Sequence, residues 1–141
     1  MLNLLDENKA EEVCPSKVIL KFLIFKKHRS QVIDCDRREI QFRINKWKRN
    51  EIGKIKIGRK NDNEIVLDSD VVRRLHGLID VKINHNHVLN FSYNDLGHGT
   101  ILNKKLLNNK TSYLDNNSVL RFGDLNNGLN FEVKFGYELI L

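Results

Sequence analysis

Residues 54–83 read KIKIGRKNDNEIVLDSDVVRRLHGLIDVKI, and this segment indicates the fold most clearly. It holds short runs of Val, Ile and Leu at residues 54–57, 65–67 and 78–83, which glycine-containing and polar segments separate. Ile55 and Ile57 alternate with lysines, so both side chains point to one face of an extended strand. Short alternating runs with turn residues between them are typical of the strands of a sandwich or barrel.

The same pattern continues on both sides of this stretch. Further β-type runs are expected at residues 18–25, 38–44, 88–93, 101–102, 119–122, 131–135 and 138–141. Nothing long and helical joins the runs, which disfavours a parallel α/β architecture. The sequence therefore predicts an all-β sandwich of two antiparallel sheets over residues 17–141. Residues 1–16 form an acidic N-terminal tail, in which Pro15 blocks helical continuation.

Length and charge narrow the class of protein. The chain has 141 residues, of which 40% are hydrophobic, and this supports one core. The net charge of +6 favours an anionic partner such as a phosphopeptide, a nucleic acid or an acidic membrane. The chain lacks both a run of ~20 apolar residues and a secretory signal, so we expect a soluble, intracellular protein that is not secreted. Cys14 and Cys35 are expected as free thiols, in the tail and in a turn.

Four polar segments at predicted strand ends contain groups that suit a phosphate. Phosphate oxygens call for guanidinium groups, hydroxyls and exposed backbone N–H groups on rigid loops. In chain order the segments are Ile57-Gly58-Arg59 with the loop at residues 60–63, Val72-Arg73-Arg74-Leu75-His76-Gly77, Asp95-Leu96-Gly97-His98-Gly99-Thr100 with Asn103, and residues 114–123, LDNNSVLRFG.

In this order and spacing the segments resemble the forkhead-associated (FHA) domain family. The family pattern is Gly-Arg, then Ser-Arg-x-His, then Ser-x-Asn-Gly-Thr with a later Asn, then Leu-x-Asp-Gly-Asp-x-Ile-x-Phe-Gly. The resemblance covers residues 17–141 and implies an FHA-type β-sandwich of about eleven strands. It also implies a module that binds a phosphothreonine-containing partner protein and carries out no chemistry. Such a module would serve signalling of the DNA-damage type in the nucleus. The cytoplasm is the alternative location.

The resemblance assigns roles to individual residues. The residues implied to bind the phosphopeptide are Arg59, Lys60, Asn61, Arg73, Arg74 and His98. The residues implied to support the binding loops are Gly58, His76, Gly99, Thr100 and Asn103. The same resemblance implies no catalytic residue, metal, cofactor or small-molecule substrate.

Two departures from the family pattern bear on phosphate binding. Arg73 stands where the family has a phosphate-binding Ser, and Ser69 is the nearest hydroxyl. In the third segment, where the family has Ser-x-Asn-Gly-Thr, Leu96 stands in place of the Ser and His98 in place of the Asn. The turn that contains them is about two residues shorter than in the family. A degenerate domain that acts as a phosphate-independent scaffold or dimerisation unit is therefore the alternative.

In the fourth segment Asn117 replaces a Gly, and Asn tolerates the positive φ expected there.

Other classes of function find less support in the sequence. A nucleic-acid-binding β domain would use the basic stretch around Trp47, formed by Lys46, Lys48, Arg49, Lys54 and Lys56. A single aromatic residue is too few for a base-stacking surface, which disfavours this interpretation. His85 and His87 have metal-ligand spacing but no third ligand nearby, so a hairpin tip is the better account. A homodimer remains open, although the tail offers only Ser16 as a phosphorylatable residue.

Overall fold

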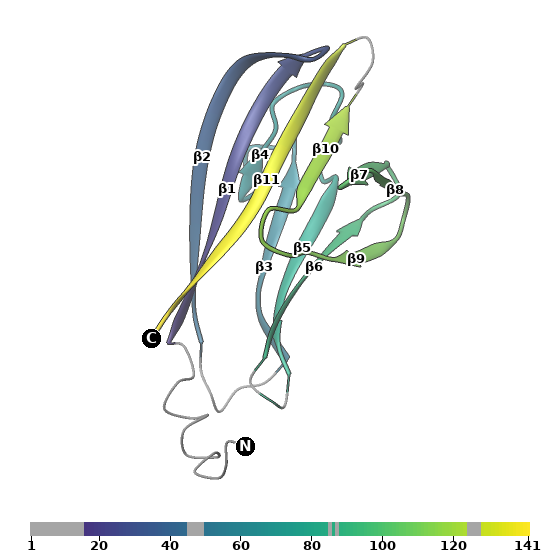
Figure 1. Ribbon diagram of the computed structural model, residues 1–141. Helices are drawn as coiled ribbons and strands as arrows, with labels where there is room; N and C mark the ends of the chain where they lie inside the picture. Colours follow the sequence, from purple (N-terminus) through teal and green to yellow (C-terminus); the bar gives the residue numbers. More distant parts are fainter. Residues whose placement is uncertain (1–15, 45–49, 85, 87, 124–127) are drawn as a thin grey trace.

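The computed structural model describes residues 16–44, 50–84, 86, 88–123 and 128–141. The described residues form strands joined by turns and contain no helix, so none that could cross a membrane. Figure 1 shows the strands as two layers that pack face to face. The strands are β1 Lys17–His28, β2 Gln31–Arg43, β3 Asn50–Gly58, β4 Ile65–Val66, β5 Gly77–Ile83, β6 Leu89–Asp95, β7 Thr100–Leu102, β8 Lys105–Leu107, β9 Thr111–Tyr113, β10 Val119–Gly123 and β11 Leu129–Ile140.

The predicted two-sheet sandwich is confirmed. One sheet has six strands in the order β2-β1-β11-β10-β7-β8, and the other has five in the order β4-β3-β5-β6-β9. The prediction of purely antiparallel sheets is wrong for one pair, because β3 and β4 run parallel, with Ile57 opposite Ile65. The loop after β3 folds back on itself, which brings β4 alongside the end of β3 in the same direction.

Alternation along the strands builds the core. On β1 the residues Val18, Leu20, Phe22 and Ile24 are buried, while the residues between them face outward. The two sheets meet through aromatic side chains, as in the contact between Phe91 on β6 and Phe135 on β11, whose ring centroids are 5.4 Å apart. Each buried side chain of this size contributes about 1.5–3 kcal/mol, so the core holds the sheets rigidly together and fixes the loops at their ends.

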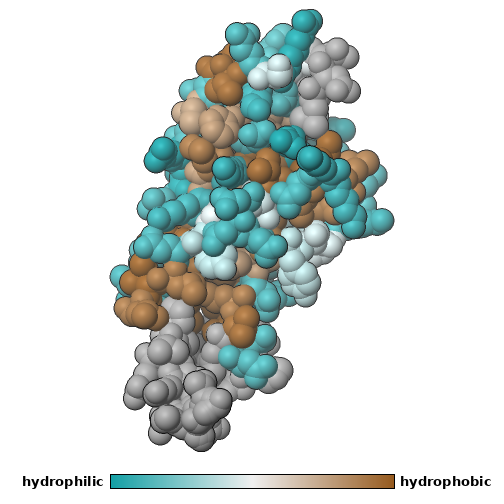
Figure 2. Space-filling view, viewed as in Figure 1, coloured by the Kyte–Doolittle hydropathy of each residue, from teal (hydrophilic) through white to brown (hydrophobic). Residues whose placement is uncertain are grey.

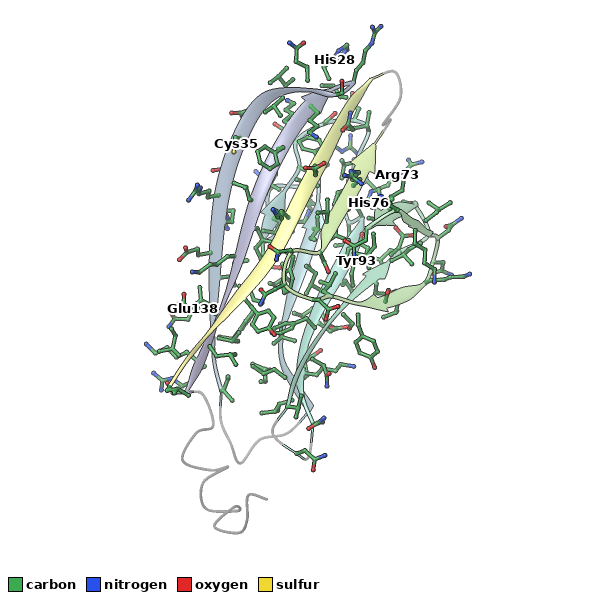
Figure 3. The ribbon with its side chains drawn as sticks, viewed as in Figure 1. His28, Cys35, Arg73, His76, Tyr93 and Glu138 are labelled. Carbon is green, nitrogen blue, oxygen red and sulfur yellow. The ribbon has the colours of Figure 1, made fainter. Side chains whose placement is uncertain are left out.

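Strand bounds differ from the predicted runs in several places. The runs predicted at residues 131–135 and 138–141 belong to one strand, because Gly136 and Tyr137 continue the pairing of β11 with β1. The short strands β8 and β9 were not predicted, because each has only three residues and shows no clear alternation of apolar and polar side chains. Strand β2 begins seven residues before the predicted run, so Cys35 is exposed in its middle and not in a turn (Figure 3).

The surface is mainly hydrophilic on the face seen in Figure 2, with several separate apolar patches. The exposed large apolar residues come from different elements: Val32 and Ile33 on β2, Val66 on β4, Val71 and Leu75 in the β4–β5 loop, Val88 before β6, Leu106 on β8, Tyr113 on β9, Leu139 on β11 and Leu141. Single exposed apolar residues are common on the surfaces of folded proteins. The predicted acidic tail lies outside the described residues, apart from Ser16, whose N–H donates to Ile140 O at 2.8 Å.

Candidate functional site

The loops after β3 and β4 are joined through their backbones. The N–H of Arg59 donates to Arg73 O at 2.8 Å, and the N–H of Lys60 donates to Arg74 O at 3.3 Å. This close approach requires a glycine at the end of β3, since a Cβ on Gly58 would overlap the Arg74 carbonyl oxygen. The two pairs of basic residues therefore keep fixed positions relative to each other.

Asn63 strengthens this junction. Its side-chain amide is buried and donates to Lys60 O at 2.8 Å and to Arg74 O at 2.7 Å, and its backbone N–H donates to Lys60 O at 3.1 Å. The β3–β4 loop is thereby folded into a compact turn that leaves Asn61 exposed. The sequence analysis placed Asn63 only within the loop at residues 60–63, and the one signal for its role is an amide two residues before Ile65, where β4 begins.

His76 connects three parts of the site through three hydrogen bonds. Its backbone N–H donates to Ile57 O at 2.8 Å, at the end of β3. Its ring Nδ1 accepts from the N–H of Arg73 at 3.2 Å, within the β4–β5 loop. Its Nε2 lies 2.9 Å from Gly99 O, in the β6–β7 loop, and donates to it, because Nδ1 is already the acceptor. In Figure 3 the buried His76 lies next to the exposed Arg73.

This hydrogen-bond pattern requires a neutral imidazole. Burial lowers the pKa of His76 below its usual value, against the opposing effects of the Gly99 carbonyl and the Asp95 carboxylate. The ring packs edge-on against Phe122, with centroids 5.1 Å apart, and lies 5.5 Å from the ring of His98. His76 is thus uncharged near neutral pH and braces the loops.

Asp95 organises the β6–β7 loop. Its carboxylate is buried at the end of β6, and Oδ2 accepts four backbone N–H bonds. The donors are Gly97 at 3.0 Å, His98 at 3.1 Å, Gly99 at 3.1 Å and Asn109 at 2.9 Å. The short turn that departs from the family pattern is therefore held by the Asp95 side chain, to which the sequence analysis assigns no role.

The second oxygen of Asp95 is also satisfied. Thr100 Oγ1 donates to Oδ1 at 2.7 Å, and Tyr93 Oη lies 2.7 Å from the same hydroxyl, to which it donates. Burial raises the pKa of the Asp95 carboxyl, but the hydrogen bonds from Asn109, Thr100, Gly99 and Gly97 outweigh burial and hold the pKa below its usual value. Asp95, which is charged at neutral pH, thus ties the Gly-Thr segment to the sheet.

The exposed groups around this framework are basic. Arg73 and Arg74 are exposed, and the described residues place no acid within ion-pair distance of either guanidinium. Arg59 is partly exposed and pairs with Asp70, with Nη1 and Oδ1 3.1 Å apart. The exposed Lys60 lies 3.7 Å from Asp62. Guanidinium groups on rigid loops can bind an anion with several acceptor oxygens.

Most of the sequence-predicted site residues lie in these three loops. The β3–β4 loop provides Lys60 and Asn61, the β4–β5 loop provides Arg74, and the β6–β7 loop provides the exposed His98. Asn103 lies apart from them in the β7–β8 turn, with φ 56°, where its Oδ1 accepts from the N–H of Val119 at 2.8 Å. The expected positive φ at Asn117 is confirmed, at 73°.

Other predicted groups are not in the site or are engaged elsewhere. Ser69 is half-buried, and its Oγ accepts from the N–H of Val71 at 3.4 Å. His85, His87 and the basic stretch from Lys46 to Arg49 lie outside the described residues. Across the described ranges no group of His, Cys, Asp and Glu has the arrangement of a metal site.

Comparison with known proteins identifies the family. The model of the FHA domain matches residues 55–123, which contain the three loops and their supporting residues. This part of the chain belongs to the FHA domain family. No curated protein sequence matches the chain of this FHA domain.

Solved structures share the fold of this FHA domain at low sequence identity. The MEK1 FHA domain is 16% identical, with a TM-score of 0.56 over 95% of this chain and 98% of that chain. The MEK1 FHA domain in complex with a HOP1 phosphothreonine peptide is 18% identical, with a TM-score of 0.53 over 80% and 94%. Full-length yeast Pml1p is 18% identical, with a TM-score of 0.57 over 86% and 83%. The low identities agree with a divergent member of the family.

Proposed function

We propose that this FHA domain binds a phosphothreonine-containing segment of a partner protein at the end formed by the three loops, and performs no chemistry of its own. The observation that carries the proposal is the network centred on His76, which joins all three loops and presents Arg59 and Arg73 on one framework. The related MEK1 FHA domain, solved with a phosphothreonine peptide, supports the same ligand class.

The geometry suits a phosphate better than a carboxylate. A phosphothreonine brings close to two negative charges and three acceptor oxygens, which can use several guanidinium groups at once. The hydrogen bond between the Arg59 N–H and Arg73 O holds the two residues on adjacent backbone segments before the ligand arrives. Such preorganisation reduces the ordering entropy that binding must overcome.

Arg73 takes over the role of the missing serine in this proposal. Its side chain is exposed, and no described acid pairs with it. A guanidinium can bind two phosphate oxygens at once, so the substitution replaces a short hydroxyl contact with a charged one. We expect stronger dependence on the phosphate charge than a serine would give.

The biological role that we propose is recruitment that depends on a kinase. The phosphorylated partner would join a signalling assembly, of the DNA-damage type and in the nucleus, and this part of the proposal rests on the association of many FHA domains with such assemblies. Imaging of the tagged protein before and after DNA damage tests it. A location that excludes the nucleus under both conditions would contradict it.

A phosphate-independent scaffold is the second candidate. The observation in its favour is the ion pair between Arg59 and Asp70, which occupies the guanidinium expected to bind phosphate.

A nucleic-acid ligand would differ in the salt dependence of its binding. The logarithm of the binding constant falls steeply with the logarithm of the salt concentration when a protein contacts several phosphates.

Fluorescence anisotropy with a degenerate phosphothreonine peptide library tests the proposal. Phosphoserine and unphosphorylated libraries serve as ligand controls, and the Arg59→Ala variant serves as the protein control. We expect binding that requires phosphothreonine and that Arg59→Ala weakens by about 1.5–3 kcal/mol, the typical value for a charged hydrogen-bond partner. Equal affinity for phosphorylated and unphosphorylated peptides, unchanged by Arg59→Ala, would favour the phosphate-independent scaffold.

A further inference from the structure

The two side chains of the Arg59–Asp70 ion pair differ strongly in solvent exposure. The two atoms Nη1 and Oδ1 are 3.1 Å apart, yet the Asp70 side chain is 99% exposed and the Arg59 side chain is 35% exposed. The aspartate lies in the β4–β5 loop, and the backbone hydrogen bond from Arg59 to Arg73 O keeps the two loops adjacent. Asp70 is therefore a carboxylate held in solvent at the edge of the proposed site.

A phosphate at this site must compete with Asp70 for the same guanidinium. Moving the Asp70 side chain away uncovers no apolar surface, because that side chain is already in water. Exposed ion pairs of this kind contribute little, so the phosphate can displace it. The displaced carboxylate, however, remains attached to the same loop, close to the phosphate dianion that it repels.

We propose that Asp70 is a specificity-determining residue, which holds Arg59 in the free domain and pairs with a lysine or arginine of the partner next to the phosphothreonine in the complex. The exchange replaces one ion pair by two and removes the repulsion between Asp70 and the phosphate. This inference rests on the proposed function and adds the chemistry of the partner: a phosphothreonine with a basic neighbour. The net charge of +6 alone would instead favour acidic peptides throughout.

Anisotropy with defined peptides tests this inference. The probes are one phosphothreonine peptide with alanine at the flanking positions and a set in which a single lysine occupies each flanking position in turn. The proteins are the wild type, Asp70→Asn and the matched control Asp115→Asn, which removes the same charge from an exposed residue in the β9–β10 connection. Because Asp70 is almost fully exposed, Asp70→Asn should fold normally, and circular dichroism checks this.

The inference predicts two linked results. The wild type and Asp115→Asn bind the peptide with lysine at one particular position about two- to fivefold more tightly than the alanine peptide, a ratio typical of one exposed ion pair. Asp70→Asn loses this preference and binds the alanine peptide about two- to fivefold more tightly than the wild type does. Binding by Asp70→Asn in the absence of wild-type binding would also support Asp70 as a competitor.

Two outcomes would overturn the inference, and they differ in what they say about the proposed function. Phosphothreonine binding that is the same in Asp70→Asn and the wild type for every peptide would leave the function intact and remove Asp70 from the site. An absence of phosphothreonine binding in both proteins would overturn the proposed function and the inference together.

Discussion

Replacing Asp95 by asparagine tests the idea that one buried carboxylate holds the β6–β7 loop. Oδ2 accepts the N–H groups of Gly97, His98, Gly99 and Asn109, and Oδ1 accepts the Thr100 hydroxyl. An asparagine side chain of the same shape keeps one oxygen for the four N–H donors. Its amide group can donate to the threonine hydroxyl, so the fold should survive while the charge is lost.

The structure sets the expected size of the effect. Hydrogen bonds to a charged acceptor contribute about 1.5–3 kcal/mol and neutral ones about 0.5–1.5 kcal/mol, and linked bonds are not additive. We expect Asp95→Asn to lower the free energy of unfolding by about 2 kcal/mol. Asp95→Ala leaves the donors without a partner and should lower it by about 4 kcal/mol.

Urea denaturation followed by circular dichroism measures these values, and its pH dependence checks the charge. The folded-state pKa of Asp95 lies below the unfolded value of about 3.9, so its contribution is fully present above that pH and is lost as the pH falls through the folded pKa. The difference between the wild type and Asp95→Asn should therefore shrink as the pH falls below about 4.

Exposed Asp115 provides the control, since Asp115→Asn should change stability by less than about 0.5 kcal/mol. A stability of Asp95→Asn equal to that of this control would show that the Asp95 carboxylate does not hold the β6–β7 loop. So would a difference from the wild type that stays constant down to the lowest pH at which the protein folds.

The remaining predictions concern the other contacts of the framework. Gly58→Ala should destabilise the fold by about 2–3 kcal/mol and weaken phosphopeptide binding, because the new methyl group overlaps the Arg74 carbonyl oxygen; equal urea midpoints for wild type and variant would contradict this. Burial lowers the pKa of His76, so the unfolded chain binds the proton at a higher pH than the folded chain does. The free energy of unfolding should therefore decrease as the pH falls below about 6.5, by at most about 1.4 kcal/mol per pH unit. A His76→Gln variant should show a flatter dependence of stability on pH. Glu132→Gln should lower stability by about 1 kcal/mol in thermal unfolding, since the carboxylate bridges Lys27 and Arg121 on the outer side of the six-stranded sheet, and an unchanged midpoint would count against that bridge.

Strands with a buried face were predictable, and exposed or very short strands were not. The alternation of β1 and β5 follows directly from one side facing the core, as at Ile79, Val81 and Ile83. Strand β2 shows no such alternation over residues 31–39, because it lies at the edge of its sheet with all of these residues exposed. In β8 only Leu107 is buried, which gives no period to detect.

The candidate site divides in the same way. The Gly-Arg, Arg-x-His and Gly-Thr segments mark the three loops because they carry specific residue types at fixed spacing. The buried acceptors and donors that join the loops, Asn63 and Asp95, are ordinary turn residues in sequence and acquire their role through contacts across 11 and 14 residues. The pairing of Arg59 with Asp70 likewise spans two loops, so only the folded arrangement reveals it.

Backbone amide shifts measured by two-dimensional NMR during titration with a phosphothreonine peptide test whether the three loops bind the phosphate. We predict saturable shifts at Arg59, Lys60, Arg73, Arg74 and the Gly97–Gly99 turn, with little change along β2, and no such shifts with the unphosphorylated peptide. Shifts confined to another face, or identical shifts with both peptides, would contradict phosphothreonine recognition by the three loops.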